Sequence, residues 1–150
     1  CKKIEPNVCP TSSRIKVLQE MKKAGIPTMV WLDPFLPFIN DTQQNIKNLL
    51  DVCLSVGVKG IMCFGIGETL RDGNREYCYK AFDRHFPGLK EQYIRTYKNA
   101  YELPSPNAKA LQSAFNRICA ASGMLSTPEE CFRYIHALPA KHIQMSIFDM

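Results

Sequence analysis

Hydrophobic side chains recur at intervals of three and four residues in two segments, residues 11–24 and 42–56. The recurring positions are Ile15, Leu18 and Met21 in the first segment and Ile46, Leu49, Leu50 and Cys53 in the second. Such spacing places apolar side chains on one face of a helix. A glycine, Gly25 or Gly57, follows each segment, and glycine readily adopts the left-handed conformation that ends helices. The pattern predicts two amphipathic helices.

Two short apolar segments, residues 27–33 and 58–64, are rich in residues that favour strands. Pro34 and Pro37 follow the first segment and prevent it from continuing as a helix. The order strand, helix, strand with short links predicts a βαβ unit, in which the two strands lie parallel and the crossover is right-handed. The fold class is therefore expected to be α/β.

The remaining sequence is expected to be mainly helical. Asn40-Asp41-Thr42 reads as the start of the second helix, with Asp41 as a cap, and residues 65–73 read as a glycine-rich loop. Further helices are predicted over residues 74–84, around Leu89, Tyr93 and Tyr97, from Ser105-Pro106 to Gly123, and from Thr127-Pro128 through Phe132 and Ile135.

Two strands are too few for a parallel sheet, because both faces of such a sheet are normally covered and the sheet is usually larger. The sequence begins at Cys1 rather than at a methionine. We therefore expect further strands to precede Cys1, so that the chain is the C-terminal part of a longer protein. Exposed strand edges would also favour self-association into a homo-oligomer.

Composition narrows the choice of chemistry. The 19 basic residues exceed the 14 acidic ones, a balance that allows an anionic partner without demanding nucleic acid. The seven cysteines are odd in number, several lie in apolar segments, and none forms a C-x-x-C pair, so neither a disulfide framework nor a metal site is expected. There is no long apolar run and no apolar leader, which favours a cytoplasmic protein away from membranes.

Several blocks of sequence share a pattern with a known family. They are AGIPT at 24–28, WLDPFLPFIND at 31–41, CFGIG at 63–67 and TLRDGNREY at 69–77, with further matches at 84–89 and 105–107. Together they resemble the radical S-adenosylmethionine (SAM) family related to spore photoproduct lyase, also described as DNA repair photolyase-like. The resemblance covers most of the chain.

The resemblance implies a partial (β/α) barrel of six strands, with the βαβ unit as its last two. Residues 1–70 would then be the C-terminal part of the barrel, residues 71–138 a helical extension, and residues 139–150 a tail. It also implies a lyase-like parent enzyme acting in DNA repair, in which a C-x3-C-x2-C motif binds a [4Fe–4S] cluster and one open iron binds SAM. That motif is absent, so this chain alone is expected to bind neither cofactor and to be inactive, and no catalytic residue is assigned.

The chain could still supply the distal wall of the SAM and substrate pocket, because ligands of parallel barrels bind beyond the carboxyl ends of the strands. The residues at or just after those ends are Trp31, Asp33, Pro34, Asn40, Phe64, Gly65 and Gly67. The glycines would let the backbone approach the ligand, and Asp33 or Asn40 could bond its polar edges. The alternative is structural, with Trp31 in the core and the glycines in a turn.

Arg71, Asn74 and Arg75 surround a glycine turn at the expected pocket mouth and could bind a phosphate or carboxylate of the substrate. Asp72 and Glu76 could instead neutralise the two arginines as surface pairs. The basic and aromatic residues from 71 to 101 could also contact DNA. Their tyrosines share a helix face with Leu89, however, so a core stripe with a solvated basic face is the default interpretation.

The C-terminal residues Gln144, Met145, Ile147 and Phe148 resemble the short peptide with which bacterial repair and replication proteins bind the sliding clamp. One amide would fix the register, and three apolar side chains would enter pockets. The same tail could instead pack on its own domain. The alternative to an enzyme is therefore a non-catalytic module that binds nucleic acid or the sliding clamp.

Overall fold

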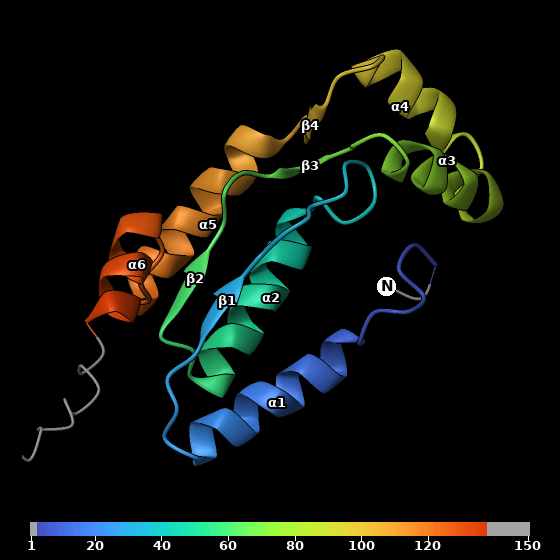
Figure 1. The fold of residues 1–150 in the computed structure, drawn as a ribbon. Helices are drawn as coiled ribbons and strands as arrows, with labels where there is room; N and C mark the ends of the chain where they lie inside the picture. Colours follow the sequence, from blue (N-terminus) through green and yellow to red (C-terminus); the bar gives the residue numbers. More distant parts are fainter. Residues whose placement is uncertain (1–2, 138–150) are drawn as a thin grey trace, which may run out of the picture.

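The computed structural model describes residues 3–137. The helices are α1 (Thr11–Lys23), α2 (Gln43–Val56), α3 (Asn74–His85), α4 (Leu89–Tyr97), α5 (Ala108–Ser122) and α6 (Pro128–His136), and the strands are β1 (Met29–Trp31), β2 (Gly60–Met62), β3 (Gly67–Thr69) and β4 (Glu102–Pro104). Helices α3 and α4 lie at one end of the molecule with β3 and β4, and the other helices gather around β1 and β2 (Figure 1). The predicted clamp-binding residues Gln144, Met145, Ile147 and Phe148 lie outside the described part.

Strands β1 and β2 pair in parallel, with Val30 opposite Ile61, and α2 forms the connection between them. The predicted βαβ unit is confirmed. Helix α2 ends at Gly57, whose φ of 72° is the left-handed conformation expected there. Its N-cap is Thr42, whose hydroxyl accepts a hydrogen bond from the Asn45 amide at 3.1 Å, so the prediction that Asp41 caps the helix is wrong.

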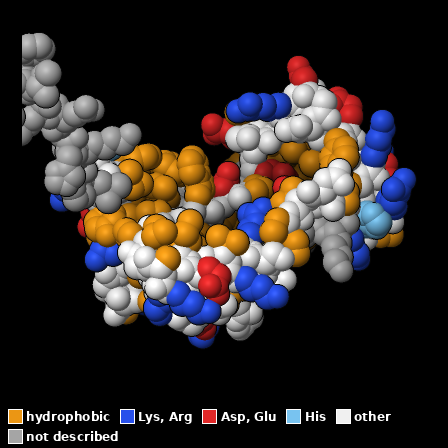
Figure 2. Space-filling view, turned by 60° about the horizontal axis from the view of Figure 1, so that its bottom comes forward, with side chains coloured by type: hydrophobic (Ala, Val, Ile, Leu, Met, Phe, Trp, Pro, Cys, Tyr) orange, Lys and Arg blue, Asp and Glu red, His pale blue; other side chains and the backbone are white. Residues whose placement is uncertain are grey.

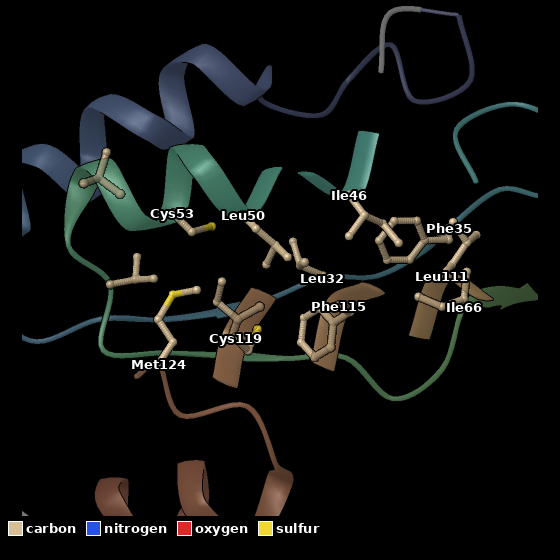
Figure 3. Packing of buried hydrophobic residues seen from close by; sticks show 13 residues of the cluster. Leu32, Phe35, Ile46, Leu50, Cys53, Ile66, Leu111, Phe115, Cys119 and Met124 are labelled. Carbon is tan, nitrogen blue, oxygen red and sulfur yellow. The ribbon is translucent and has the colours of Figure 1, made fainter. Parts of the chain in front are cut away.

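The main hydrophobic core lies between this strand pair and helices α2 and α5, which pack against each other (Figure 3). Ile61 from β2 and Ile46 and Leu50 from α2 have no exposed surface, and Phe115 from α5 is 1% exposed. The periodic apolar face predicted for residues 42–56 is the face of α2 that enters this core, whereas α1 has no buried residue. Each parallel strand therefore has one face held by helices.

Leu125, which follows α5, extends β2 on the edge away from β1. The Ile61 amide donates to the Leu125 carbonyl at 2.8 Å, and the Leu125 amide donates to the Lys59 carbonyl at 3.3 Å. Gly60 permits this approach, because a Cβ there would lie 2.9 Å from both Leu125 Cβ and the Leu125 carbonyl oxygen. β2 is thus central, whereas the outer edge of β1 pairs with no strand of residues 3–137.

A second, antiparallel pair joins β3 to β4, with Glu68 opposite Leu103. The prediction of a loop over residues 65–73 is therefore wrong for Gly67–Thr69, and no strand was predicted at Glu102–Pro104 in the mainly helical region. Both strands are three residues long and mix glycine, proline and charge, so neither carries a periodic signal. The strand pair therefore joins residues from both sides of the expected domain boundary between residues 70 and 71.

Helices α3 and α4 pack with this small sheet around a second apolar cluster. The buried members are Ile4, Leu70, Phe82, Leu89, Tyr93 and Leu103. The stripe of Leu89, Tyr93 and Tyr97 predicted for a core face is confirmed, since Tyr93 is fully buried and Tyr97 packs beside the cluster. The aromatic residues of α4 consequently pack in or beside this second cluster.

The helix starts near the C-terminus differ in how well they were predicted. Thr127 and Glu130 form the expected capping box of α6, with proline in its first turn. α5 begins at Ala108 rather than at Ser105-Pro106, and the buried Ser105 hydroxyl accepts from the Asn107 amide at 3.0 Å. The same hydroxyl donates to Asp41 Oδ2 at 2.5 Å, which links the start of α5 to the segment before α2.

The structure is mixed α/β, as predicted. The described residues contain two small sheets and no closed barrel. None of the helices within residues 3–137 combines the length and the apolar character needed to cross a bilayer.

Leu50→Ala is expected to lower the free energy of unfolding by about 3 kcal/mol, because Leu50 is fully buried in the core that holds α2 on the strand pair. Leu54→Ala on the same helix is the matched control, because Leu54 is 38% exposed and should cost roughly 1 kcal/mol or less. Urea denaturation followed by circular dichroism measures both values. Equal losses would contradict this description of the core.

Candidate functional site

A cleft of about 1050 Å³ opens beside the carboxyl ends of β1 and β2. Its far wall comes from β3, β4 and the start of α3, and part of its rim comes from the N-terminal segment and α1. Figure 2 shows this face hollowed between two lobes, with hydrophobic, acidic and basic side chains at the hollow. All the residues predicted for the ligand wall line the cleft: Trp31, Asp33, Pro34, Asn40, Phe64, Gly65 and Gly67.

Trp31 and Phe64 form an aromatic pair at the carboxyl ends of the two parallel strands. Their ring centroids are 4.8 Å apart, and the planes are tilted by 45°. Both side chains line the cleft, and they are 58% and 54% exposed. Trp31 therefore does not fill the core, which was the structural alternative for this residue. Exposed adjacent rings of this kind can stack on a planar ligand or attract a cation.

Asp33 and Cys63 lie near each other beside this pair. Partial burial raises the pKa of the Asp33 carboxyl above its usual range. Burial also raises the pKa of the Cys63 thiol, and the nearby Asp33 charge adds to the effect. The thiol donates a weak hydrogen bond to the Gly65 carbonyl at 3.4 Å. Cys63 is therefore held as a neutral thiol, and a neutral thiol is a poor nucleophile and metal ligand.

Asn40 and Gly67 have structural tasks in addition to their position at the cleft. The Asn40 side-chain oxygen accepts from the Leu36 amide at 2.6 Å and so closes the loop after β1. Gly67 allows β3 to lie against β4, since a Cβ at this position would be 2.5 Å from the Leu103 carbonyl oxygen. Gly65, in contrast, has a φ of 133° and open space around it. Of the three, Gly65 is the one that leaves room for a ligand.

Glu68 is a cleft residue that the sequence did not single out. It lies in the middle of β3, is only 9% exposed, and its Oε1 has no hydrogen-bond partner among the described residues. Burial raises its pKa to about 7, and the nearby Asp33 carboxylate acts in the same direction, although Tyr93 and Arg75 partly oppose the shift. A buried carboxyl with one unpartnered oxygen and a raised pKa beside a cleft is typical of a functional site.

A local pattern could have indicated Glu68. It is the one charged residue between Gly67 and Leu70, and its neighbours at alternate positions, Ile66 and Leu70, are apolar. In a strand these alternate residues share a face, so the glutamate would have been expected on a buried face. The pattern is informative only once residues 66–70 are known to be extended.

The residues predicted for substrate binding separate into two places. Asn74 lines the cleft, whereas Arg71 and Arg75 line a smaller depression of about 540 Å³ next to Tyr101. Arg75 donates to the carbonyl oxygens of Ala100 at 2.6 Å and of Leu70 and Lys98 at 3.4 Å. It therefore fastens the segment before β4 to the end of β3. Arg71 bonds the Tyr101 hydroxyl at 3.3 Å and is otherwise turned to solvent.

Tyrosine hydroxyls of α4 hold the cleft walls in place. Tyr93 donates to the Pro37 carbonyl at 2.9 Å, and this bond is buried. Tyr97 donates to the Pro104 carbonyl at 2.7 Å. Phe38, next to Pro37, has a φ of 63°, an uncommon conformation for a residue with a side chain, and its ring contacts both tyrosines. The loop after β1 is thus fixed to α4.

Glu68→Gln is expected to remove a pH dependence of stability. The pKa of Glu68 rises from 4.5 to about 7 on folding, so the folded state binds more protons than the unfolded state between these values. The contribution of Glu68 to the free energy of unfolding should therefore be most favourable below pH 4.5. It should decrease as the pH rises through about 7, by up to about 3 kcal/mol.

Denaturant titrations across that pH range should show the variant gaining stability over the wild type as the pH rises. Glu102→Gln is the matched control, because Glu102 lies on the adjacent strand and is exposed. If stability depended on pH in the same way in the wild type and in Glu68→Gln, the pKa of Glu68 would not be raised by folding.

Comparisons with known proteins give a partial match. The chain is 25% identical over 101 residues to an uncharacterized protein of Mycobacterium bovis, and equally to uncharacterized proteins of two Mycobacterium tuberculosis strains. The matched region is 67% of this chain and 29% of each relative, so the chain spans less than a third of the length of these relatives. No protein-family model matches the sequence. No solved structure matches it.

Proposed function

We propose that this chain forms the distal wall of the SAM and substrate pocket in a radical SAM enzyme resembling spore photoproduct lyase. The observation that carries the proposal is the exposed pair of Trp31 and Phe64, which two parallel strands present at their carboxyl ends to a cleft of about 1050 Å³. Ligands of parallel α/β proteins bind at this end of the strands. The cleft is also large enough for a cofactor and a substrate together.

The open edge of β1 supports a larger sheet in the whole protein. Among residues 3–137, no strand pairs with that edge. Helix α1, which precedes β1, has no buried residue, and Val17 and Met21 are 56% and 37% exposed. An additional parallel strand and its helix would cover both the edge and this helix. The greater length of the mycobacterial relatives agrees with such an arrangement.

The cleft suits SAM but does not suit the iron–sulfur cluster. Carboxyl groups line the cleft, which fits the positive sulfonium and ammonium groups of SAM, and the aromatic pair could stack on its adenine. SAM would supply the radical for the reaction. The cysteines, in contrast, are core residues: Cys53 and Cys119 share the main hydrophobic core, Cys131 is also buried, and burial raises each thiol pKa. Residues 3–137 hold no group of three metal-ligating side chains, so the cluster thiolates would come from other residues of the whole protein.

DNA is the substrate that the resemblance implies, and the two arginines differ in their availability for it. Arg71 is exposed beside Tyr101 and could bond a phosphate. Arg75 already donates to backbone carbonyls. In this proposal Arg71 contacts a DNA phosphate, and Arg75 holds the end of β3 in position.

Phe64→Ala is expected to weaken SAM binding by about tenfold or more, because stacking on an aromatic side chain contributes roughly 1–3 kcal/mol. The measurement is equilibrium dialysis with labelled SAM, on the whole protein reconstituted anaerobically with iron and sulfide. Phe132→Ala is the control, since Phe132 is 43% exposed on α6 and does not line the cleft. A whole protein without a C-x3-C-x2-C motif, or equal affinities for the two variants, would overturn the proposal.

A further inference from the structure

Glu68 lacks an interaction that a buried carboxyl normally has. The residue is only 9% exposed, it lines the cleft, and its Oε1 is buried without a hydrogen-bond partner among the described residues. Leaving a buried acceptor without a partner is costly, and the cost is larger when the group is charged. A ligand in the cleft that donates a hydrogen bond would remove this cost.

The strand that carries Glu68 is fixed on both sides, so the carboxyl cannot reach water by a shift of the backbone. The Phe35 amide donates to the Gly67 carbonyl at 3.0 Å, and the Ser105 amide donates to the Ile66 carbonyl at 2.8 Å. The absence of a side chain at Gly67 keeps β3 against Leu103. The carboxyl is therefore preorganised at the cleft wall.

Groups near Glu68 from each neighbouring element are already engaged or carry no positive charge. From α3, Arg75 donates to three carbonyl oxygens, and burial holds Cys78 as a neutral thiol by raising its pKa to about 11. From α4, the Tyr93 hydroxyl lies near Glu68 and lowers its pKa, but its proton is donated to the Pro37 carbonyl. After β1, Asp33 contributes a second carboxyl. The missing partner is thus a donor that the described residues do not provide.

The rest of the cleft lining defines the chemistry of that donor. The acidic and basic residues of the lining are four carboxyl groups and two basic groups, namely Glu5, Asp33, Glu68 and Glu102 with Lys3 and Arg14. The exposed rings of Trp31 and Phe64 can attract a cation or stack on a flat one. No described group of three ligating side chains could hold a metal ion, which favours an organic cation.

We propose that the cleft binds a small, flat organic cation of the amidine class, whose N–H groups donate to Glu68 and Asp33 and whose ring stacks on Trp31 and Phe64. The inference goes beyond the proposed function, because it adds Glu68 on β3 to the aromatic pair already described and needs neither SAM nor a cluster. Binding requires ionised Glu68, so the affinity rises as the pH increases through about 7 and the ligand displaces a proton below that pH.

The experiment uses benzamidine, a flat monocation, and benzamide, its neutral analogue of the same shape, titrated into the cluster-free protein and followed by NMR. Benzamidine should bind about tenfold more tightly than benzamide above pH 7, because a charge-assisted hydrogen bond contributes roughly 1.5–3 kcal/mol. Glu68→Gln should remove most of this preference, because only Asp33 and the aromatic pair remain, whereas Glu102→Gln, which removes an exposed carboxyl that makes no contact in the proposal, should keep it.

A second measurement needs no variant. Calorimetry of benzamidine binding at about pH 6 in two buffers of different protonation enthalpy should show the release of a proton, as expected for a carboxyl that is protonated in the free cleft. Equal affinity for benzamidine and benzamide, an unchanged preference in Glu68→Gln, or no proton release would each overturn the proposal. Because SAM and iron are absent from the experiment, such a failure would leave the proposed function standing.

Discussion

The parallel pairing of β1 with β2 is the constraint on which the candidate site depends. Parallel neighbours require a crossover, and α2 provides it while its buried face fills the core against α5. As a result both strands end at the same edge of the sheet. Trp31 and Phe64, which are far apart in the sequence, therefore come within 4.8 Å of each other. An antiparallel arrangement would have placed these two rings at opposite edges.

The small antiparallel sheet of β3 and β4 supplies the opposite wall of the cleft. Its position depends on polar contacts that include Arg75 to the backbone before β4, Tyr97 to Pro104 and Tyr93 to Pro37. Glu68 sits within this framework without a partner for one oxygen, and it therefore lowers stability at neutral pH. A rigid surrounding structure is what allows an unfavourable group of this kind to persist.

The sequence predicted the elements that carry periodic hydrophobic signals and missed those that do not. The βαβ unit, the start of α3 and the capping box at Thr127 were predictable, because each rests on local spacing or on a cap residue. β3 and β4 were not, because two three-residue strands form only by pairing with each other across 32 intervening residues, 70 to 101. Glu68 was missed for the same reason. Asp41 was assigned to a cap although its partner, Ser105, lies far along the chain.

Tyr93 has a mechanical consequence for the cleft. Its buried hydroxyl bonds the Pro37 carbonyl, and its ring packs on Phe82 of α3 with centroids 4.8 Å apart. One side chain thus joins the loop after β1 to the helical lobe on the far side. If the lobes moved apart to open the cleft, this hydrogen bond would break and the Tyr93 ring would become exposed to water at the same time. Tyr93 therefore opposes separation of the loop from the helical lobe.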